Sequence, residues 1–233
     1  MRWKEIDTGL ASAATNMQLD AQMLESLEQP TLHFYDWAKP SITYGHFIDP
    51  SKFLNLSSLE RRGIDYARRP TGGGIVFHMW DLAFSVLVPA KSNLFSLNTL
   101  DNYAFVNQAV LRAAQNFMGE KKNLSLTPTD LAARQEDCRR FCMAQPTKYD
   151  VIWNERKIAG AAQRKTRQGF LHQGTIALVM PEMEVLQDVL RGGDIASAML
   201  AHTYPLSGEK KLEDARNELK QLLRKEFIHE NSH

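Results

Sequence analysis

Cysteine is scarce in this chain, which carries only Cys138 and Cys142 among its 233 residues. Two cysteines exclude a framework of several disulfides, and we expect both thiols to be reduced. Two thiols also fall short of the four ligands that a structural zinc site requires, so no metal site is expected. The sequence therefore predicts neither a disulfide-stabilised fold nor a zinc centre.

An excess of either charge is also lacking, because 28 Lys and Arg residues stand against 27 Asp and Glu residues, which leaves a formal net charge of +1. This balance gives no general electrostatic attraction to nucleic acid or to an anionic membrane. No apolar run approaches the roughly 18 residues of a membrane-spanning helix, and residues 1–7 contain no apolar signal segment. We therefore expect a cytoplasmic protein with no nucleic-acid partner and no membrane partner.

The spacing of apolar residues predicts two groups of strands with helices between and after them. Steps of three and four residues predict helices over residues 14–27 and 98–118, with Gly119 as the C-cap of the second. Another helix is expected to open at Pro181, and a last one to carry the apolar residues from Leu212 to Phe227. Short apolar runs bounded by Pro, Asp and Gly predict strands at residues 31–37, 41–47, 65–69, 74–78, 83–89, 149–154, 157–163 and 169–179. This length and grouping favour one α/β domain.

Three consecutive glycines, at positions 72, 73 and 74, stand between two apolar runs. Glycine weakens a strand by about 0.5–1 kcal/mol relative to alanine, so a triple glycine indicates that another group approaches the backbone closely. Arg68 and Arg69 before the glycines and His78 after them add cationic and titratable groups suited to a carboxylate, a phosphate or a developing oxyanion. The alternative is a plain glycine hairpin with two solvated arginines.

A second constellation follows a predicted hairpin tip at Lys157. Gly160 and Ala161 just downstream leave room beside this lysine for a substrate chain, and its ammonium suits a carbonyl oxygen or a carboxylate. The alternative is a solvated lysine at a sheet edge. His172 and Gly174 then interrupt an apolar run, which indicates a further substrate contact or, equally, a satisfied histidine at the end of the sheet.

Four segments in this order resemble the family of lipoate-protein ligase A and the octanoyltransferases, with biotin protein ligases as more distant members. They are Asn-Met-Gln-Leu-Asp at 16–20, Ser-Ile-Thr-Tyr-Gly at 41–45, the glycine segment at 68–78 and Lys-Ile-Ala-Gly at 157–160. The resemblance covers most of the chain and implies a mixed, largely antiparallel sheet flanked by helices. It also implies that residues 1–233 form one catalytic domain without a separate C-terminal accessory domain.

The resemblance assigns roles to individual residues. The side chains and backbone of Arg69, Thr71, Gly72, Gly73, Gly74 and His78 would line the tunnel for the acyl group, and Lys157 would contact the acyl carbonyl. We group Gly160, Ala161, His172 and Gly174 with them as substrate-binding candidates. For the general base only His78 and His172 are candidates, and the sequence does not place either within reach of an incoming amine.

The chemistry depends on Cys142, which lies in a segment that looks like the cysteine loop of octanoyltransferases with a thiol nucleophile. A thiolate can take an acyl group from a carrier thioester and pass it to an amine. Arg139, Arg140 and Lys157 would supply positive charge that favours the thiolate. The alternatives for the arginine pair are a solvated charge pair and a docking site for an acidic acyl carrier or lipoyl domain. The alternative for Cys142 is a small buried apolar residue.

The resulting hypothesis is transfer of an octanoyl or lipoyl group to a lysine on lipoyl domains of 2-oxoacid dehydrogenases or on the glycine-cleavage H protein, with acyl carrier protein as donor. No tightly bound cofactor is expected. The first alternative is a lipoate-protein ligase that uses ATP and Mg²⁺ and passes through lipoyl-AMP, and the second is a non-catalytic module that binds acyl groups or lipoyl domains. The sequence does not determine the donor, the preferred acceptor or the oligomeric state.

Overall fold

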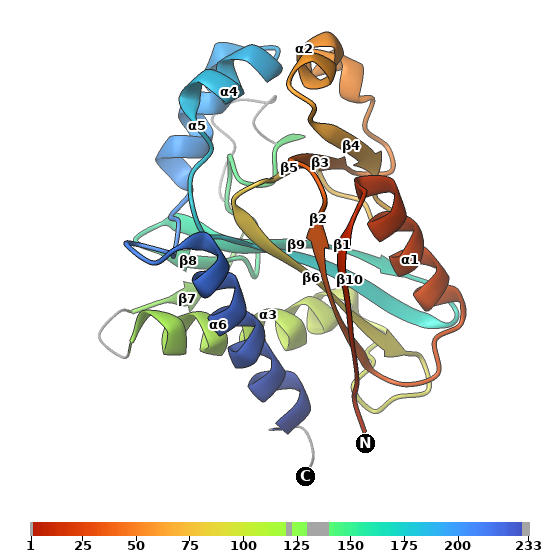
Figure 1. Ribbon diagram of the computed structural model, residues 1–233. Helices are drawn as coiled ribbons and strands as arrows, with labels where there is room; N and C mark the ends of the chain where they lie inside the picture. The colour runs from red at the N-terminus through yellow and green to blue at the C-terminus, as the bar shows by residue number, and fades with distance from the viewer. Residues whose placement is uncertain (1, 120–122, 130–139, 230–233) are drawn as a thin grey trace.

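A seven-stranded sheet forms the centre of the protein in the computed structural model, which describes residues 2–119, 123–129 and 140–229 (Figure 1). The strand order is β1-β2-β6-β10-β9-β8-β7, and every neighbouring pair is antiparallel except β1 with β2. The strands are β1 (Lys4–Ala11), β2 (Thr31–Trp37), β6 (Asp81–Pro89), β7 (Ser125–Leu126), β8 (Val151–Trp153), β9 (Arg156–Lys165) and β10 (Gly169–Ala177). This mixed, largely antiparallel sheet with flanking helices confirms the predicted fold class.

A second sheet of three strands lies beside the large one. Its order is β4-β3-β5, with β3 parallel to β4 and antiparallel to β5. The strands are β3 (Ser41–Tyr44), β4 (Asp65–Arg68) and β5 (Ile75–His78). The triple glycine connects β4 to β5, so it lies at one end of this small sheet.

The helices divide between the two faces of the large sheet (Figure 1). Helices α3 (Thr99–Met118) and α6 (Leu212–Arg224) pack together on one face, and α1 (Ala13–Glu25) lies on the other face against the small sheet. The remaining helical segments are η1 (Pro50–Lys52), α2 (Leu56–Arg61), α4 (Met183–Val189), α5 (Gly193–His202) and the π-helical turn η3 (Lys225–His229). Caps fix the ends of the long helices: Ser12 begins α1, Asn98 begins α3, and Gly119 ends α3 as predicted.

Two apolar cores hold these layers. The first packs α3 and α6 against the sheet through Phe34, Phe84 and Phe170, and the second fills the space between the small sheet and helices α4 and α5. Strands β6 and β10 are buried along their whole length because both faces of the sheet are covered. The functional residues described below lie between the large and the small sheet.

Several elements differ from their predicted bounds. Strand β1 and helices α2 and α5 were not predicted, and β3 ends at Tyr44 because the chain turns there toward the glycine segment. Within the described residues, no helix is long and apolar enough to cross a membrane. Residues Cys138 and Arg139 lie outside the described residues.

Candidate active site

The glycine segment is packed tightly against two other parts of the backbone. A Cβ on Gly74 would stand 2.2 Å from the carbonyl oxygen of Arg140, and a Cβ on Gly45 would stand 2.0 Å from that of Gly73. Gly73 itself has a φ of 81°, which side chains disfavour. Gly74 is therefore required for the close approach of the chain that carries Cys142, and Gly45 for the close approach of the glycine segment itself.

Arg69 holds this segment from inside. Its side chain is buried, and its guanidinium donates to the carbonyl oxygens of Gly72 at 3.1 Å and Gly74 at 2.6 Å and to the hydroxyl of Thr43 at 2.8 Å. Burial lowers the pKa of the guanidinium from its ordinary value. Arg69 thus stabilises the conformation of the glycine segment, and its cationic side chain also lines the cavity described below.

Cys142 and Lys157 lie together, as the sequence predicts. The ammonium of Lys157 lies 3.5 Å from the Cys142 sulfur and donates to the Cys142 carbonyl oxygen at 2.7 Å. Its side chain is only 1% exposed, which rules out the alternative of a solvated edge lysine. Lys157 also pairs with Asp150, whose carboxylate lies 2.6 Å from Nζ.

The ion pair sets the charge at this point. Burial by itself lowers the pKa of Lys157, but the charges of Asp150 and Cys142 outweigh burial and raise that pKa above its usual value. Burial raises the pKa of Asp150, and Lys157 opposes that shift. Thr147 also donates to the Asp150 carboxylate through its backbone nitrogen at 2.6 Å and its hydroxyl at 2.9 Å. Lys157 is thus a fixed ammonium beside the thiol at neutral pH.

Gly160 provides the space for this arrangement. A Cβ there would stand 2.5 Å from Nζ of Lys157 and 3.0 Å from Oδ1 of Asp150. The prediction that small residues leave room beside Lys157 is sound for Gly160, but that room is filled by the buried ion pair. The sequence did not identify Asp150, although an acidic residue seven positions before a buried lysine across a tight hairpin was a usable signal.

A cavity of about 390 Å³ opens in front of the thiol. Its lining includes eight of the predicted residues: Arg69, Gly73, Gly74, His78, Cys142, Gly160, Ala161 and Gly174. Ala162, another of the small residues that the sequence placed after Lys157 to leave room for a substrate, also lines it. Six more lining residues were not predicted: Met17, Tyr35, Thr43, Val76, Gln173 and Thr175. Together with Ala162 they come from α1, β2, β3, β5, β9 and β10, so the cavity lies between the two sheets.

His78 occupies one wall of this cavity with both ring nitrogens engaged. Nε2 lies 2.7 Å from the hydroxyl of Thr43, and Nδ1 lies 2.7 Å from a carboxylate oxygen of Asp81. Arg69 already donates to Thr43, so the hydroxyl hydrogen is directed to Nε2, and the ring hydrogen on Nδ1 is donated to Asp81. Trp37 stacks on the ring with centroids 4.4 Å apart.

The opposite end of the cavity carries a buried polar chain. The hydroxyl of Thr71 donates to Gln173 at 2.6 Å, and Gln173 donates to Asp20 at 2.6 Å. Asp20 also pairs with His33 at 2.8 Å. Thr71 is therefore held against the end of the cavity without lining it. Asp20 was noted in the sequence only as the last residue of the motif at 16–20, with no role at the site.

His172 lies apart from the cavity. Its ring is buried next to Tyr103, with Nδ1 2.8 Å from the side-chain nitrogen of Gln163, and burial lowers its pKa to about 3. A Cβ on the neighbouring Gly174 would stand 2.4 Å from the ring of Phe84 in the first core. Gly72 and His172 are not among the lining residues of the cavity.

No group of three or more His, Cys, Asp or Glu side chains suited to a metal ion occurs among the residues that the structure describes. The lining of the cavity supplies a thiol and several glycine backbones. Lys157 is not among the lining residues, and its paired ammonium lies 3.5 Å from the thiol. This set fits acyl transfer through a thioester with a cation at the carbonyl oxygen.

Comparison with known proteins identifies a protein family whose model matches most of this chain. Residues 12–227 match the model of the lipoyl protein ligase A/B catalytic domain. Octanoyltransferase LipM of Anoxybacillus flavithermus is 30% identical over 186 residues, which are 77% of this chain and 66% of that protein. LipM of Bacillus subtilis is 28% identical over 185 residues with the same coverage. The chain thus spans about two thirds of the length of these curated relatives.

Solved structures show the same fold at lower identity. A bi-partite lipoate protein ligase from Thermoplasma acidophilum, studied with its E2 lipoyl domain, has a TM-score of 0.73 at 21% identity, covering 97% of this chain and 84% of that one. A lipoate-protein ligase A bound with ATP has a TM-score of 0.72 at 22% identity, covering 97% and 85%.

Proposed function

Since the chain belongs to the lipoyl protein ligase A/B catalytic domain family, we propose that it attaches an octanoyl or lipoyl group to a lysine of lipoyl carrier domains. The preferred reaction is octanoyl transfer from acyl carrier protein through a thioester on Cys142. The LipM octanoyltransferases among the relatives support transfer over ligation. The observation that carries the proposal is the Cys142 thiol, which borders the cavity 3.5 Å from the ammonium of Lys157.

In the first step the thiolate of Cys142 attacks the carbonyl carbon of the donor thioester. Two hydrogens of the Lys157 ammonium are held by Asp150 and by the Cys142 carbonyl oxygen, and the third is directed at the sulfur. As negative charge moves from sulfur to the carbonyl oxygen, this third hydrogen stabilises the oxyanion. The bond to the donor sulfur then breaks, and the donor leaves as a thiolate that takes a proton from solvent.

In the second step the amine of the acceptor lysine attacks the Cys142 thioester. A carbon–nitrogen bond forms, the bond to Cys142 sulfur breaks, the amine proton passes to solvent, and the thiolate is regenerated. His78 is a poor base in this geometry because Thr43 and Asp81 already occupy its nitrogens. His172 is enclosed beside Tyr103, away from the cavity.

The substrates follow from the cavity and the family. The cavity has a lining of apolar and small residues together with a few polar groups, which suits an acyl chain. Lipoyl domains of 2-oxoacid dehydrogenases or the glycine-cleavage H protein are the proposed acceptors, in line with the archaeal lipoate ligase studied with its E2 lipoyl domain. No tightly bound cofactor takes part in this scheme. A cytoplasmic setting would supply both carrier proteins.

The test is the intact mass of the protein after incubation with octanoyl-acyl carrier protein, with and without a lipoyl domain. We expect one octanoyl adduct that hydroxylamine removes, that is absent in Cys142→Ala, and that moves to the lipoyl domain when this acceptor is added. The matched variant Cys142→Ser keeps the size of the side chain and should form no adduct that hydroxylamine releases at neutral pH.

Parallel reactions with lipoate, ATP and Mg²⁺ address the alternatives. Acceptor modification that needs ATP and survives in Cys142→Ala would identify a lipoate-protein ligase acting through lipoyl-AMP. Absence of acceptor modification with every donor would leave a non-catalytic acyl-binding or lipoyl-domain-binding module.

A further inference from the structure

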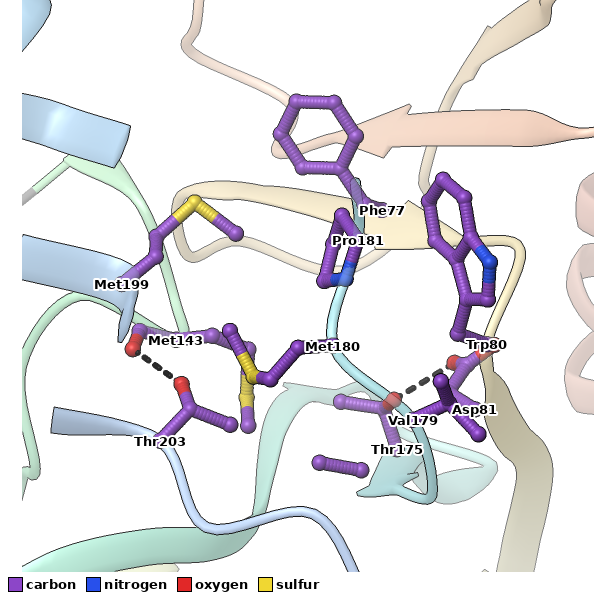
Figure 2. Close-up of a pocket in the computed structure, with 11 residues that line it drawn as sticks. Phe77, Trp80, Asp81, Met143, Thr175, Val179, Met180, Pro181, Met199 and Thr203 are labelled. Atoms are coloured by element: carbon purple, nitrogen blue, oxygen red, sulfur yellow. Dashed lines mark hydrogen bonds between the residues drawn. The ribbon is translucent and has the colours of Figure 1, made fainter. Parts of the chain in front are cut away.

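A second cavity shares the lining residue Thr175 with the cavity that the thiol lines. Figure 2 shows the side chains around this second cavity. Methionines 143, 180 and 199 gather on one side of it, and Trp80 lies on the opposite side. Methionine side chains are unbranched and adapt to a flexible apolar chain. None of the catalytic steps described above uses this cavity.

The two cavities share one lining residue near the thiol. Thr175 lines both of them, and it stands opposite Gly160 in the pairing of β10 with β9. Gly160 is the residue whose missing side chain makes room for Nζ of Lys157. The shared wall at this junction therefore lies beside the ammonium of Lys157, which is 3.5 Å from the thiol.

Strand β5 separates the cavities beyond this junction. Its alternation directs Val76 and His78 toward the first cavity and Phe77 toward the second. The hydrogen-bonded pair of His78 and Asp81 completes the wall, and Thr175 donates to the same carboxylate oxygen of Asp81 at 2.6 Å. A molecule that reached both cavities would have to bend at Thr175.

A polar group without a partner lies in the second cavity. Asp81 is 5% exposed and lines the cavity, and its Oδ1 has no hydrogen-bond partner within the described residues. A buried carboxylate oxygen that lacks a donor is costly, so an N–H or O–H placed at this wall of the cavity would be favourable. The apolar lining and one strong acceptor together fit a chain that carries amide or hydroxyl groups.

A thioester donor has two arms that diverge from its carbonyl carbon, the acyl chain and the thiol arm. We propose that the second cavity receives the amide-bearing thiol arm of the donor, a pantetheine, while the octanoyl chain occupies the first cavity. This inference rests on the proposed function. Asp81 Oδ1 accepts a hydrogen bond from an amide or hydroxyl of the arm, and the thioester bend lies at Thr175 beside Cys142.

The second cavity is also where the leaving group departs. Attack by the Cys142 thiolate forms the new carbon–sulfur bond, and collapse of the tetrahedral intermediate breaks the bond to the pantetheine sulfur. The released thiolate takes a proton from solvent, and the arm leaves the cavity before the acceptor lysine enters. The acyl chain stays in the first cavity throughout.

The test compares two donors that share the octanoyl group, S-octanoyl-pantetheine and S-ethyl octanethioate, in the rate constant for acylation of Cys142. The unmodified protein should favour the pantetheine ester by about tenfold or more, because loss of the arm leaves Asp81 Oδ1 unpaired. Val179 is 38% exposed at the rim of the second cavity, so Val179→Trp fills the cavity with little strain on the fold.

We expect Val179→Trp to lose the preference for pantetheine while its rate with the ethyl ester stays within about twofold. The matched control is Leu10→Trp, which places the same indole at a 73% exposed position on β1 and should behave like the unmodified protein. Equal acylation rate constants for the two donors in the unmodified protein would overturn the inference. An equal loss of acylation rate with both donors in Val179→Trp would also overturn it.

Two further outcomes separate the proposals. If Val179→Trp keeps the pantetheine preference but loses conversion of lipoate with ATP, the cavity belongs to a nucleotide and the inference is wrong. If neither thioester acylates Cys142 in the unmodified protein, the proposed function itself fails, and the arm inference fails with it.

Discussion

Lys157 illustrates what one residue type in a sequence can and cannot reveal. A lysine at the start of a strand is usually solvated, and only the small residues after it and the triple glycine before it favoured a functional role. Its partner Asp150 was missed because the contact crosses a hairpin whose register the sequence does not specify. Pairwise polar contacts of this kind require the backbone geometry.

His172 provides a pH-dependence prediction at the scale of one residue. Burial holds its pKa near 3 in the folded protein against an ordinary value of 6.5. As pH falls below 6.5, the unfolded chain takes up a proton that the folded protein refuses. The stability present above pH 6.5 is therefore lost on acidification, by about 2 kcal/mol between pH 8 and pH 5 from this group.

The measurement is the unfolding free energy in urea at pH 8 and pH 5 for the unmodified protein and His172→Phe. The variant keeps a ring against Tyr103 and should lose about 2 kcal/mol less over this range. All other titrating groups are common to both proteins. An identical pH dependence would mean that His172 becomes protonated inside the fold near its ordinary pKa.

At the scale of elements, the loop that carries Cys142 is fixed by backbone contacts. Cys142 donates its backbone N–H to the carbonyl oxygen of Ile75 at 3.0 Å, and the neighbouring Phe141 is buried in the second core. Gly74 makes this approach possible because the Arg140 carbonyl occupies the place of its missing Cβ. The sequence indicated that another group approaches the glycines, and that group is the backbone of the segment that leads to Cys142, the proposed nucleophile.

Gly74→Ala should therefore displace the thiol from Lys157. A shift of about 1 Å in a catalytic group costs on the order of a hundredfold in rate, so we expect a loss of that size in Cys142 acylation. Gly72→Ala is the matched control, because a Cβ there has no atom within 4 Å, and it should change the rate far less. Circular dichroism and thermal unfolding verify that both variants fold. Equal rates in the two variants would contradict this account of Gly74.

Elements with strong local signals were predicted and those without them were not. Helix α3 was recovered because its apolar face repeats over twenty residues and its caps are explicit. Strand β1 was missed because its residues are mostly exposed at the edge of the sheet, so its side chains lack an apolar pattern. Helix α5 begins at Gly193, directly after Gly192, and has no side-chain cap that would mark its start.

At the scale of the whole molecule, the acyl cavity lies between two sheets with separate cores. The fold class was predictable from the order of strands and helices and from the family resemblance. The packing of the small sheet over the large one was not, because it depends on contacts between residues far apart in the chain, such as Thr71 with Gln173.

An acyl chain in this cavity should stabilise the whole protein. Burial of even a few methylene groups between the sheets contributes about 2 kcal/mol, which raises the melting temperature of a chain of this size by about 4–8 °C. We expect this increase for protein octanoylated on Cys142 relative to protein acetylated on the same thiol, measured by calorimetry. Equal melting temperatures would indicate that the chain lies in solvent.

The ion pair of Lys157 with Asp150 has one more consequence, which concerns self-modification. The proposed reaction delivers an acyl group to a lysine amine, and the protein's own Lys157 lies 3.5 Å from the Cys142 sulfur. Only an unprotonated amine is nucleophilic, and the raised pKa of Lys157 keeps its nitrogen protonated. In the proposed reaction, Asp150 would thereby keep the protein from becoming its own acceptor and would reserve the acyl group for the lysine of a carrier domain.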